Sequence, residues 1–441
     1  MGSAAPGKSF FITTLGCPKN VADSEHVRLS LMSEGLEEAK SPDRSDFHLI
    51  NTCTFIQSAT EETIDTIIQA GKIKKKRKQK LIVLGCFAER YSDAIRSDIP
   101  EVDLSFGTGK YSSAGSILKS HFPEEFNGLQ EINRDNLNRD KKRKTVGRPY
   151  AYVKVSDGCN RGCHFCIIPN LRGNFRDQSE DGILLDAQSA VSAGAKEICI
   201  VSQDTVFYGK DTDRLKKVLD QISGINGLEL LRLLYLYPDK KTYNLLDYFK
   251  ENDKLAPYLE SPIQHVSEKM LKRMNRSGSY SFFADLFGKA REARKGLEIR
   301  TSLILGYPGE TEDDLEETVR FIKEVKPEKL ALFAFSPQEG TKAAELENDI
   351  SEEEAARRVN YVREVHLEVL KDIHQDRIGK IYPAIVDEVS KDQILVRRFQ
   401  DAPEIDEIVF TPFRKDLSVG QIGKVKIGSF LEYDMEGEFI H

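Results

Sequence analysis

The sequence predicts an α/β protein built from three successive regions. Residues 8–125 alternate strand-length apolar runs with helical patterns, as parallel α/β domains do. Residues 149–376 repeat a strand-then-helix pattern six times, which predicts a partial (β/α)6 barrel. Residues 378–441 hold short β-rich runs punctuated by Gly and Pro, which predicts a small OB-like β-barrel. The polar stretch 126–148 is predicted to be a linker.

In the first region, three apolar runs have the length of strands. They are residues 10–12, 47–50 and 81–84. Strands joined by helical crossovers pair in parallel, so we expect all three runs to end at one edge of a sheet. A basic run over 72–80 precedes the third strand. It is expected to be a solvated helix end, with an RNA contact as the alternative.

The second region contains the barrel elements. Its six candidate strands are 150–155, 197–202, 228–236, 258–263, 299–305 and 329–335. Helical patterns between them occupy 179–193, 280–294 and 311–325. The carboxyl ends of such strands form the rim where these barrels bind ligands. A long amphipathic helix is expected over 351–375, because Ser351 and Glu354 form a capping-box pattern at its start.

The third region has a β period. Its candidate strands are 384–389, 394–397, 408–410, 423–427 and 438–440. Runs this short, separated by turn residues, are typical of small closed barrels rather than of parallel sheets.

Composition restricts the class of protein. The 441 residues are 39% apolar and 31% charged, which excludes collagen-like, mucin-like and broadly disordered chains. The net charge of −7 argues against a general polyanion binder. No apolar run approaches the roughly 18 residues that span a membrane, and no signal-peptide pattern is seen. We therefore expect a cytoplasmic protein without a membrane partner, in which seven cysteines need an explanation other than disulfides.

Three of these cysteines lie close together in sequence. Cys159, Cys163 and Cys166 form Cys-x3-Cys-x2-Cys directly after the first barrel strand. Structural zinc usually takes four ligands, and no second cysteine knuckle lies nearby. Three thiolates on a four-iron cluster leave one iron open for a substrate or cofactor. An iron–sulfur cluster is thus favoured over zinc or buried thiols, and no other catalytic residue is assigned.

Three further cysteines are scattered but occupy equivalent positions. Cys17, Cys53 and Cys86 each follow a strand candidate of the first region. In a parallel sheet these ends share the edge where α/β folds build their sites. The pattern predicts convergence, with a second cluster, zinc and a reactive thiol set all remaining open. Cys199 lies inside a strand candidate and is expected to be a core thiol.

The Cys-x3-Cys-x2-Cys motif resembles that of the radical S-adenosylmethionine (SAM) superfamily, with Phe165 at the usual aromatic position. Together with the N-terminal triple and a TRAM-like β module, the chain resembles the methylthiotransferases over essentially its whole length. This resemblance implies two [4Fe-4S] clusters, one that binds SAM and one auxiliary. It further implies a reaction that uses two equivalents of SAM to replace a C–H with C–SCH3. An external electron donor is implied as well.

Several segments are similar to one branch of this family. They are 14–20, 51–56, 85–91, 167–173, 202–205, 235–238 and 401–406. That branch modifies the β-carbon of an aspartate in small-subunit ribosomal protein twelve, free or on the ribosome. Segments 176–179 and 260–265 depart from the usual pattern. The alternatives are a tRNA adenosine methylthiotransferase and, from another class, an iron–sulfur electron carrier or scaffold.

Four polar residues are candidate SAM contacts. Gln203 and Asp204 end the second barrel strand, and the resemblance places their segment at the SAM amino group. Gln264 and Arg300 are candidates at the same rim for the SAM carboxylate or ribose. The turn 306–311 precedes a helix whose N-terminus favours anions, and an ordinary βα loop explains it equally well.

The tail's charge bears on the substrate. Residues 380–441 hold 8 Lys and Arg against 12 Asp and Glu, a net charge of −4, concentrated in 401–407. A module that grips tRNA should be basic, whereas an acidic one suits a basic ribosomal protein.

Overall fold

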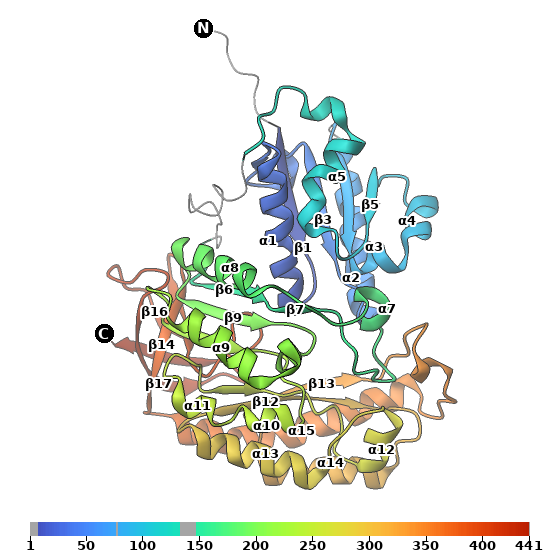
Figure 1. Ribbon diagram of the computed structural model, residues 1–441. Helices are drawn as coiled ribbons and strands as arrows, with labels where there is room; N and C mark the ends of the chain where they lie inside the picture. The colour runs from blue at the N-terminus through green and yellow to red at the C-terminus, as the bar shows by residue number, and fades with distance from the viewer. Residues whose placement is uncertain (1–7, 76–77, 133–146, 441) are drawn as a thin grey trace. The chain divides into compact units, whose positions relative to one another are not determined.

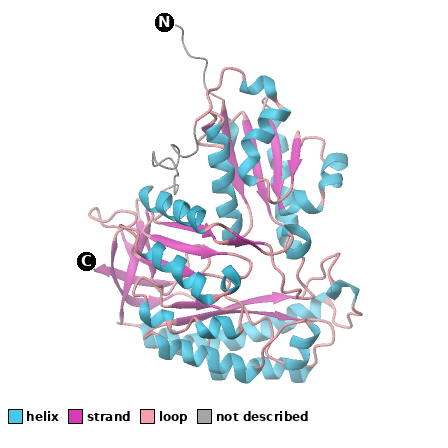
Figure 2. Cartoon of the chain, in the orientation of Figure 1, coloured by secondary structure: helices cyan, strands magenta, loops and turns pink. Residues whose placement is uncertain are grey.

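The computed structural model describes residues 8–75, 78–132 and 147–440, which form two compact units. The first unit comprises residues up to 143 together with 167–174, and the second comprises the remainder. Most of the predicted linker, residues 133–146, lies outside the described residues. Figure 1 shows the elements in chain order, and Figure 2 shows them by type. Among the described helices, none combines the length and apolar character that a membrane span requires.

The first unit is built on a five-stranded parallel sheet. Its order is β2-β1-β3-β4-β5. The strands are β1 Ser9–Thr14, β2 Glu37–Glu38, β3 Phe47–Thr52, β4 Lys80–Gly85 and β5 Leu104–Phe106. The helices are α1 Pro18–Ser33, α2 Gln57–Lys74, α3 Cys86–Arg90, α4 Ser92–Asp98 and α5 Ala114–His121. This confirms the predicted parallel sheet, and the basic run does begin at the end of α2.

Helices cover both faces of this sheet. One core cluster packs Phe10, Phe47 and Leu49 against residues of α1 and α5. A second packs Ile50 and Val83 from the opposite face against α2, α3 and α4. Neighbouring strand residues therefore point to opposite faces and are buried on both, as in doubly wound folds. Burial on both faces fixes the register of every strand, and with it the position of every strand end.

The second unit contains the six predicted barrel strands in chain order. They are β6 Tyr150–Lys154, β9 Glu197–Val201, β10 Leu230–Leu233, β11 Tyr258–Glu260, β12 Glu298–Leu305 and β13 Lys329–Ala334. They form two parallel sheets, β10-β9-β6 and β11-β12-β13. A parallel bridge between Leu231 and Leu255 and a hydrogen bond from Leu236 N to Glu260 O (3.1 Å) connect the two sheets. The prediction of a partial barrel is confirmed. A short antiparallel pair, β7 Ser156–Asp157 with β8 Arg176–Asp177, follows β6.

Helices enclose this partial barrel (Figure 1). They are α8 Glu180–Ser192, α9 Thr212–Ser223, α10 Lys240–Asn244, α11 Tyr248–Glu251, α12 Glu268–Arg273, α13 Tyr280–Ala293, α14 Glu312–Val325 and α15 Glu352–Arg377. The predicted helix over 351–375 is α15. Ser351 accepts from Glu354 N, while the Glu354 carboxylate pairs with arginines of its own helix. The reciprocal capping box is formed instead at α14, by Thr311 and Asp314.

The C-terminal residues form a closed five-stranded barrel in the order β14-β15-β16-β18-β17. The strands are β14 Ile381–Val389, β15 Gln393–Arg398, β16 Val409–Pro412, β17 Ile422–Phe430 and β18 Met435–Ile440. Alternate residues such as Val386, Val396 and Val425 fill its interior. This confirms the predicted small β-barrel.

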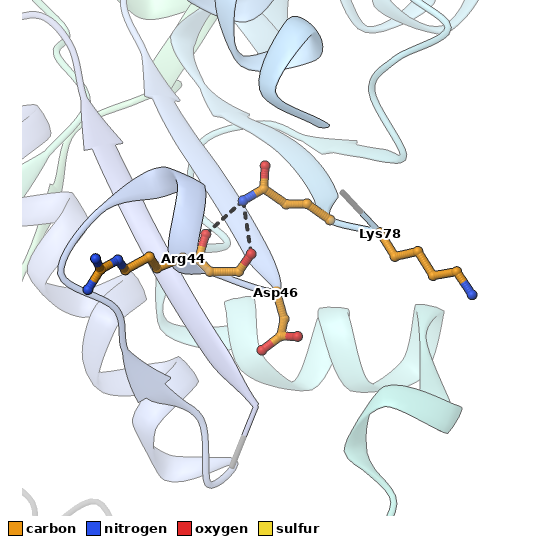
Figure 3. A pocket seen from close by; sticks show the side chains of 5 residues that line it. Arg44, Asp46 and Lys78 are labelled. Atoms are coloured by element: carbon orange, nitrogen blue, oxygen red, sulfur yellow. Dashed lines mark hydrogen bonds between the residues drawn. The ribbon is translucent and has the colours of Figure 1, made fainter. Parts of the chain in front are cut away.

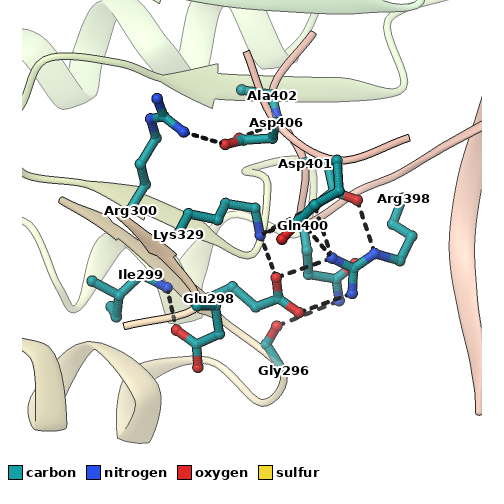
Figure 4. A network of polar contacts seen from close by, with 12 residues as sticks. Gly296, Glu298, Ile299, Arg300, Lys329, Arg398, Gln400, Asp401, Ala402 and Asp406 are labelled. Carbon is teal, nitrogen blue, oxygen red and sulfur yellow. Dashed lines mark hydrogen bonds and ion pairs between the residues drawn. The ribbon is translucent and has the colours of Figure 1, made fainter. Parts of the chain in front are cut away.

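A buried network of charges joins this small barrel to the amino ends of the larger barrel's strands (Figure 4). Glu298 at the start of β12 pairs with Arg398 at 2.9 Å and with Lys329 at the start of β13. Asp401 pairs with Arg398 at 2.8 Å and with Lys329 at 3.1 Å. Glu407 lies 3.3 Å from Lys329. The acidic segment 401–407 therefore contributes to an internal interface.

This corrects the expectation that the acidic charge concentrated in segment 401–407 serves to bind a basic protein partner. Its carboxylates at 401, 406 and 407 neutralise cations of the larger barrel. Among the described residues 380–440, the exposed charged side chains are five Lys against seven Asp and Glu. The outer surface of the module is thus close to neutral, and it lacks the basic character that tRNA phosphates would favour.

Candidate functional site: two cysteine triples

The first triple lies on one loop of the second unit. Cys159, Cys163 and Cys166 are free and half-buried. A hydrogen bond from Cys166 N to Cys163 O (3.0 Å) tightens the loop. Asn275 Nδ2 donates to the carbonyl of Gly162 at 2.8 Å and anchors the loop from the barrel side. The three thiols are thereby gathered just beyond the first strand of the barrel.

Arg161, between two of these cysteines, holds the acidic groups beside the loop. It pairs with Asp204, and with Asp239 at 2.8 Å. Its guanidinium lies 3.9 Å from the ring centroid of Tyr237, a cation–π distance. Burial raises the pKa of Asp204, and Arg161 opposes that shift. Burial also raises the pKa of the Cys159 thiol. Protons and charges at this loop are therefore coupled to those at the end of β9.

The two candidates at the end of β9 fit a cationic ligand group. Gln203 Nε2 donates to Asp157 Oδ1 at 3.3 Å. Gln203 Oε1 and Asp204 Oδ1 are buried and accept no hydrogen bond from the described residues. Unpaired buried acceptors are rare, and each is expected to have a donor in the working protein. An ammonium group such as that of SAM would satisfy both.

Phe165 and Gln264 differ in what surrounds and constrains them. Phe165 is half-buried and packs against Met270, Met274 and Tyr307, so its ring is part of a small apolar cluster. Gln264 has a φ of 72°, which is uncommon for a residue other than glycine. Strain of this kind collects where the surrounding structure fixes a side chain for function.

Arg300 is not brought to the rim. It is the third residue of β12 and lies near the amino end of that strand. Its guanidinium pairs with Asp406 at 2.5 Å and donates to the carbonyl of Ile405 at 3.3 Å (Figure 4). The expected placement beside Gln264 is therefore corrected. The predicted strand is confirmed. Its amino end, where Arg300 lies, is about 12 Å or more from the carboxyl end that forms the rim.

The turn at 306–311 has already satisfied its own backbone. The Glu310 carboxylate accepts from the backbone N–H groups of Gly306 and Tyr307, and Arg358 lies 3.6 Å from it. Thr311 and Asp314 cap α14 reciprocally. The structure thus favours an ordinary βα loop over an anion site at this helix.

The second triple is assembled by the sheet of the first unit. Cys53 and Cys86 directly follow β3 and β4, and Cys17 follows the end of β1 by three positions. The carboxyl ends of these parallel strands lie at one edge. Cys53 and Cys86 are buried and Cys17 is half-buried. Burial raises the pKa of Cys53 to about 11, and the neighbouring Cys17 adds to the shift. The thiols are therefore close enough to influence one another, as the strand-end pattern predicted.

This edge carries the topological switch point of the sheet. The strand order reverses between β1 and β3, which are followed by Cys17 and Cys53. Open α/β sheets place their ligands at such a point. Gly16 there has a φ of +92°, and a Cβ on it would lie 2.7 Å from Cys53 Cβ and 3.0 Å from Cys53 Sγ. Only glycine allows the two strand ends to approach so closely.

One arginine acts on the second triple. Arg172 pairs with Asp23 at 2.8 Å, and both side chains are almost fully buried. Burial raises the pKa of Cys86, while the charge of Arg172 and a hydrogen bond from it act in the opposite direction. Arg172 belongs to the short helix α7 Ile168–Arg172, which is part of the first unit. A cation thus stands beside one thiol of this triple.

The donor sets of both triples fit iron–sulfur clusters. Each offers three thiols and no disulfide, which leaves a fourth metal position free. Among the described residues, the three sulfurs of neither triple all lie within 4.8 Å of one another. A single zinc ion would hold thiolates about 4 Å apart, since its bonds to sulfur are about 2.3 Å. A cubane binds each thiolate through a different iron and accommodates the wider spacing.

A pocket elsewhere in the first unit does not belong to this site. It has a volume of about 350 Å³ and is lined by Arg44, Ser45, Asp46, Lys78 and Gln79 (Figure 3). These residues precede β3 and β4, whereas the cysteines follow those strands. The pocket therefore opens at the edge opposite the triple.

Apart from Asp204, sequence reasoning did not single out the charged residues that surround the two triples. Arg161 and Asp239 form part of the loop's ion-pair set, and Asp23 and Arg172 form the buried pair of the sheet edge. Arg161 stands between two motif cysteines, a signal that could have singled it out. The partners of these residues come from distant positions, which spacing alone does not reveal.

Three family models match the chain. They are Uncharacterized protein family UPF0004 over residues 9–107, the Radical SAM superfamily over 153–322 and the TRAM domain over 378–440. They cover the two cysteine triples and the closed barrel respectively.

Curated relatives match over almost the full length. One named "Ribosomal protein uS12 methylthiotransferase RimO" from Leptospira biflexa is 60% identical over 98% of this chain and 97% of its own. A protein of the same name from Clostridium novyi is 36% identical over 97% of each chain.

Solved structures share the fold. The radical S-adenosylmethionine methyltransferase TsrM from Kitasatospora setae has a TM-score of 0.54 at 11% identity, covering 74% of this chain and 73% of that one. The cobalamin-dependent S-adenosylmethionine radical enzyme OxsB has a TM-score of 0.52 at 11% identity, covering 81% and 56%. At this identity the likeness concerns the fold alone.

Proposed function

The chain belongs to the methylthiotransferase family of radical SAM enzymes, and from this premise we propose that it methylthiolates ribosomal protein uS12. The reaction replaces a C–H bond with C–SCH3 at the β-carbon of an aspartate. The observation that carries this proposal is the pairing of a loop triple with a sheet-edge triple in one chain. The 60% identical relative of that name supports the choice of substrate.

Each triple would hold one [4Fe-4S] cluster through its three thiolates. When bound, the loop cluster supplies the electron that cleaves SAM, and the auxiliary cluster supplies the site for the sulfur. The chain's own residues prepare these sites. Burial at the sheet edge keeps water from Cys53 and Cys86. At the rim, Gln203 and Asp204 present acceptors that orient an ammonium group of SAM.

We also propose that the enzyme is cytoplasmic and depends on an external electron donor. A cytoplasmic protein has access to uS12 before or after ribosome assembly, and an external reductant must supply electrons. A tRNA substrate is less well supported, because the exposed charges of the small barrel do not favour phosphates. The enzyme is thus expected to bind tRNA weakly, even at low salt.

An anaerobic assay tests the proposal. The reconstituted protein is incubated with reductant, SAM and a peptide that carries the uS12 target loop. We expect the peptide to gain one methylthio group in place of one hydrogen, by mass spectrometry. No modification of peptide, isolated uS12 or ribosomes would contradict the proposal, and modification of tRNA would favour the alternative.

Two variants, each lacking one cysteine triple, separate SAM cleavage from methylthio transfer. Replacing Cys159, Cys163 and Cys166 by Ala should abolish formation of 5′-deoxyadenosine. Replacing the three sheet-edge cysteines by Ala should leave SAM cleavage but abolish methylthio transfer. Each variant should lose about four irons per chain relative to the wild type. Loss of all iron from either variant alone would argue against two independent sites.

A further inference from the structure

Arg276 is a buried cation beside the loop triple that sequence reasoning did not single out. It follows α12 in a turn closed by a hydrogen bond from its N–H to Leu271 O (2.8 Å). Only 9% of the residue is exposed. Arginine is rarely buried without a partner, because removing its charge from water is costly.

Three contacts fix the orientation of this guanidinium. Its Nη2 donates to the carbonyl of Pro262 at 2.6 Å, and its Cζ lies 4.4 Å from the ring centroid of Tyr237. Its Nη1 donates to Cys163 Sγ at 3.4 Å. The carbonyl and the ring are neutral, so they hold the forked guanidinium in place without compensating its positive charge.

Arg276 forms no ion pair with a carboxylate of the described residues. Its charge also acts on Asp204, but that carboxylate is already paired with Arg161. By contrast, Arg161 has Asp204 and Asp239, and Arg172 has Asp23. A buried cation that lacks a carboxylate is expected to face another anion. Among the described residues, the candidate that it contacts directly is the thiol of Cys163, a ligand of the proposed cluster.

We propose that Arg276 is a positioning residue that stabilises the reduced state of the loop cluster. A cluster held by three thiolates gains one negative charge on reduction, and a nearby buried cation stabilises that charge. Hydrogen bonds to ligand sulfur act in the same direction, since both raise the reduction potential. This inference rests on the proposed assignment of a cluster to Cys159, Cys163 and Cys166.

The test compares reduction potentials in a background whose sheet-edge cysteines are replaced by Ala, so that one cluster gives the signal. Arg276→Gln removes the charge and the fork. At a fixed solution potential we expect the ratio of reduced to oxidised cluster to fall about tenfold, which corresponds to about 59 mV for a one-electron couple. Arg276→Lys retains the charge but not the fork, and we expect a smaller loss of about threefold. Redox titration followed by electron paramagnetic resonance measures both.

Lys272→Gln is the matched control, because it removes an equal charge from an exposed residue four positions earlier. Its potential should match that of the parent. A parent-like potential in both Arg276 variants, with about four irons bound, would overturn the inference and leave the proposed function intact. If Arg276→Gln fails to bind iron, the Arg276→Lys potential alone decides. A parent that binds no iron would overturn both the cluster assignment and this inference.

Discussion

The two cysteine triples reach similar donor sets by different means. The loop triple is local, since eight residues contain all three thiols. The sheet-edge triple is assembled from three strand ends that are distant in sequence. The loop triple therefore depends on a turn, whereas the sheet-edge triple exists only while β1, β3 and β4 are in register. Stability of the first unit and occupancy of its proposed cluster should accordingly change together.

The triples differ also in how charge is arranged around them. Arg172 beside Cys86 is neutralised by Asp23, whereas Arg276 beside Cys163 has no carboxylate partner among the described residues. A neutralised buried ion pair mainly stabilises the fold around it. A buried cation without a carboxylate partner mainly makes the electrostatic potential at the neighbouring metal site more positive. Variants of the first unit should therefore change its free energy of unfolding, whereas variants of Arg276 should change the reduction potential of the proposed loop cluster.

The largest expected effect is on the buried pair of the first unit. Arg172→Met leaves the Asp23 carboxylate buried without its cation, so we expect a loss of about 4 kcal/mol in the free energy of unfolding. Hydrogen exchange should show reduced protection in β3 and β4, with loss of the sheet-edge iron. Arg96→Met is the control, because Arg96 pairs with Asp93 on the surface. It should cost no more than about 0.5 kcal/mol. Equal protection in the two variants would contradict the comparison.

Acid should weaken the first unit through His48 in β3. Burial lowers the pKa of this side chain to about 4, against 6.5 in the unfolded chain. Between these values the unfolded state binds a proton that the native state does not, so stability present above pH 6.5 is lost as the pH falls towards 4. The expected loss is about 3 kcal/mol.

His48→Gln should remove this acid sensitivity, as measured by the pH dependence of exchange in β3. His121→Gln is the control, because that histidine is exposed in the same unit. An acid profile that is unchanged in His48→Gln would assign the sensitivity to other groups. The result separates proton-linked loss of the sheet from direct protonation of cluster thiols.

The sequence was informative where a local pattern determines the structure. The Cys-x3-Cys-x2-Cys spacing placed the loop triple, and apolar runs located β1, β3 and β4 well enough to place Cys17, Cys53 and Cys86 at one edge. It failed where the partner is remote. Arg300 lies on the predicted strand, but its counter-ion Asp406 comes from the small barrel 106 positions away. The same holds for the acidic segment 401–407, whose burial no local pattern reveals.

The smallest expected effect concerns the close approach at Gly16, and it tests whether the sheet-edge triple depends on backbone geometry. Gly16→Ala places a Cβ 2.7 Å from Cys53 Cβ at a φ of +92°. We expect a cost of about 2 kcal/mol, of which about 1 kcal/mol is backbone strain and the rest is crowding. Because the crowding displaces Cys53, the variant should lose about four irons while the loop triple keeps its own.

Gly109→Ala separates strain from crowding. Gly109 has a φ of +79° in the same unit, but a Cβ there would meet no atom within 4 Å. It should therefore cost only the strain of about 1 kcal/mol and retain all of its iron. Iron quantitation alongside urea unfolding distinguishes the two variants. If both lost iron equally, global destabilisation would explain the loss. If neither variant lost iron, the sheet edge would tolerate displacement of Cys53. The two triples would then differ only in how far apart their cysteines lie in the sequence.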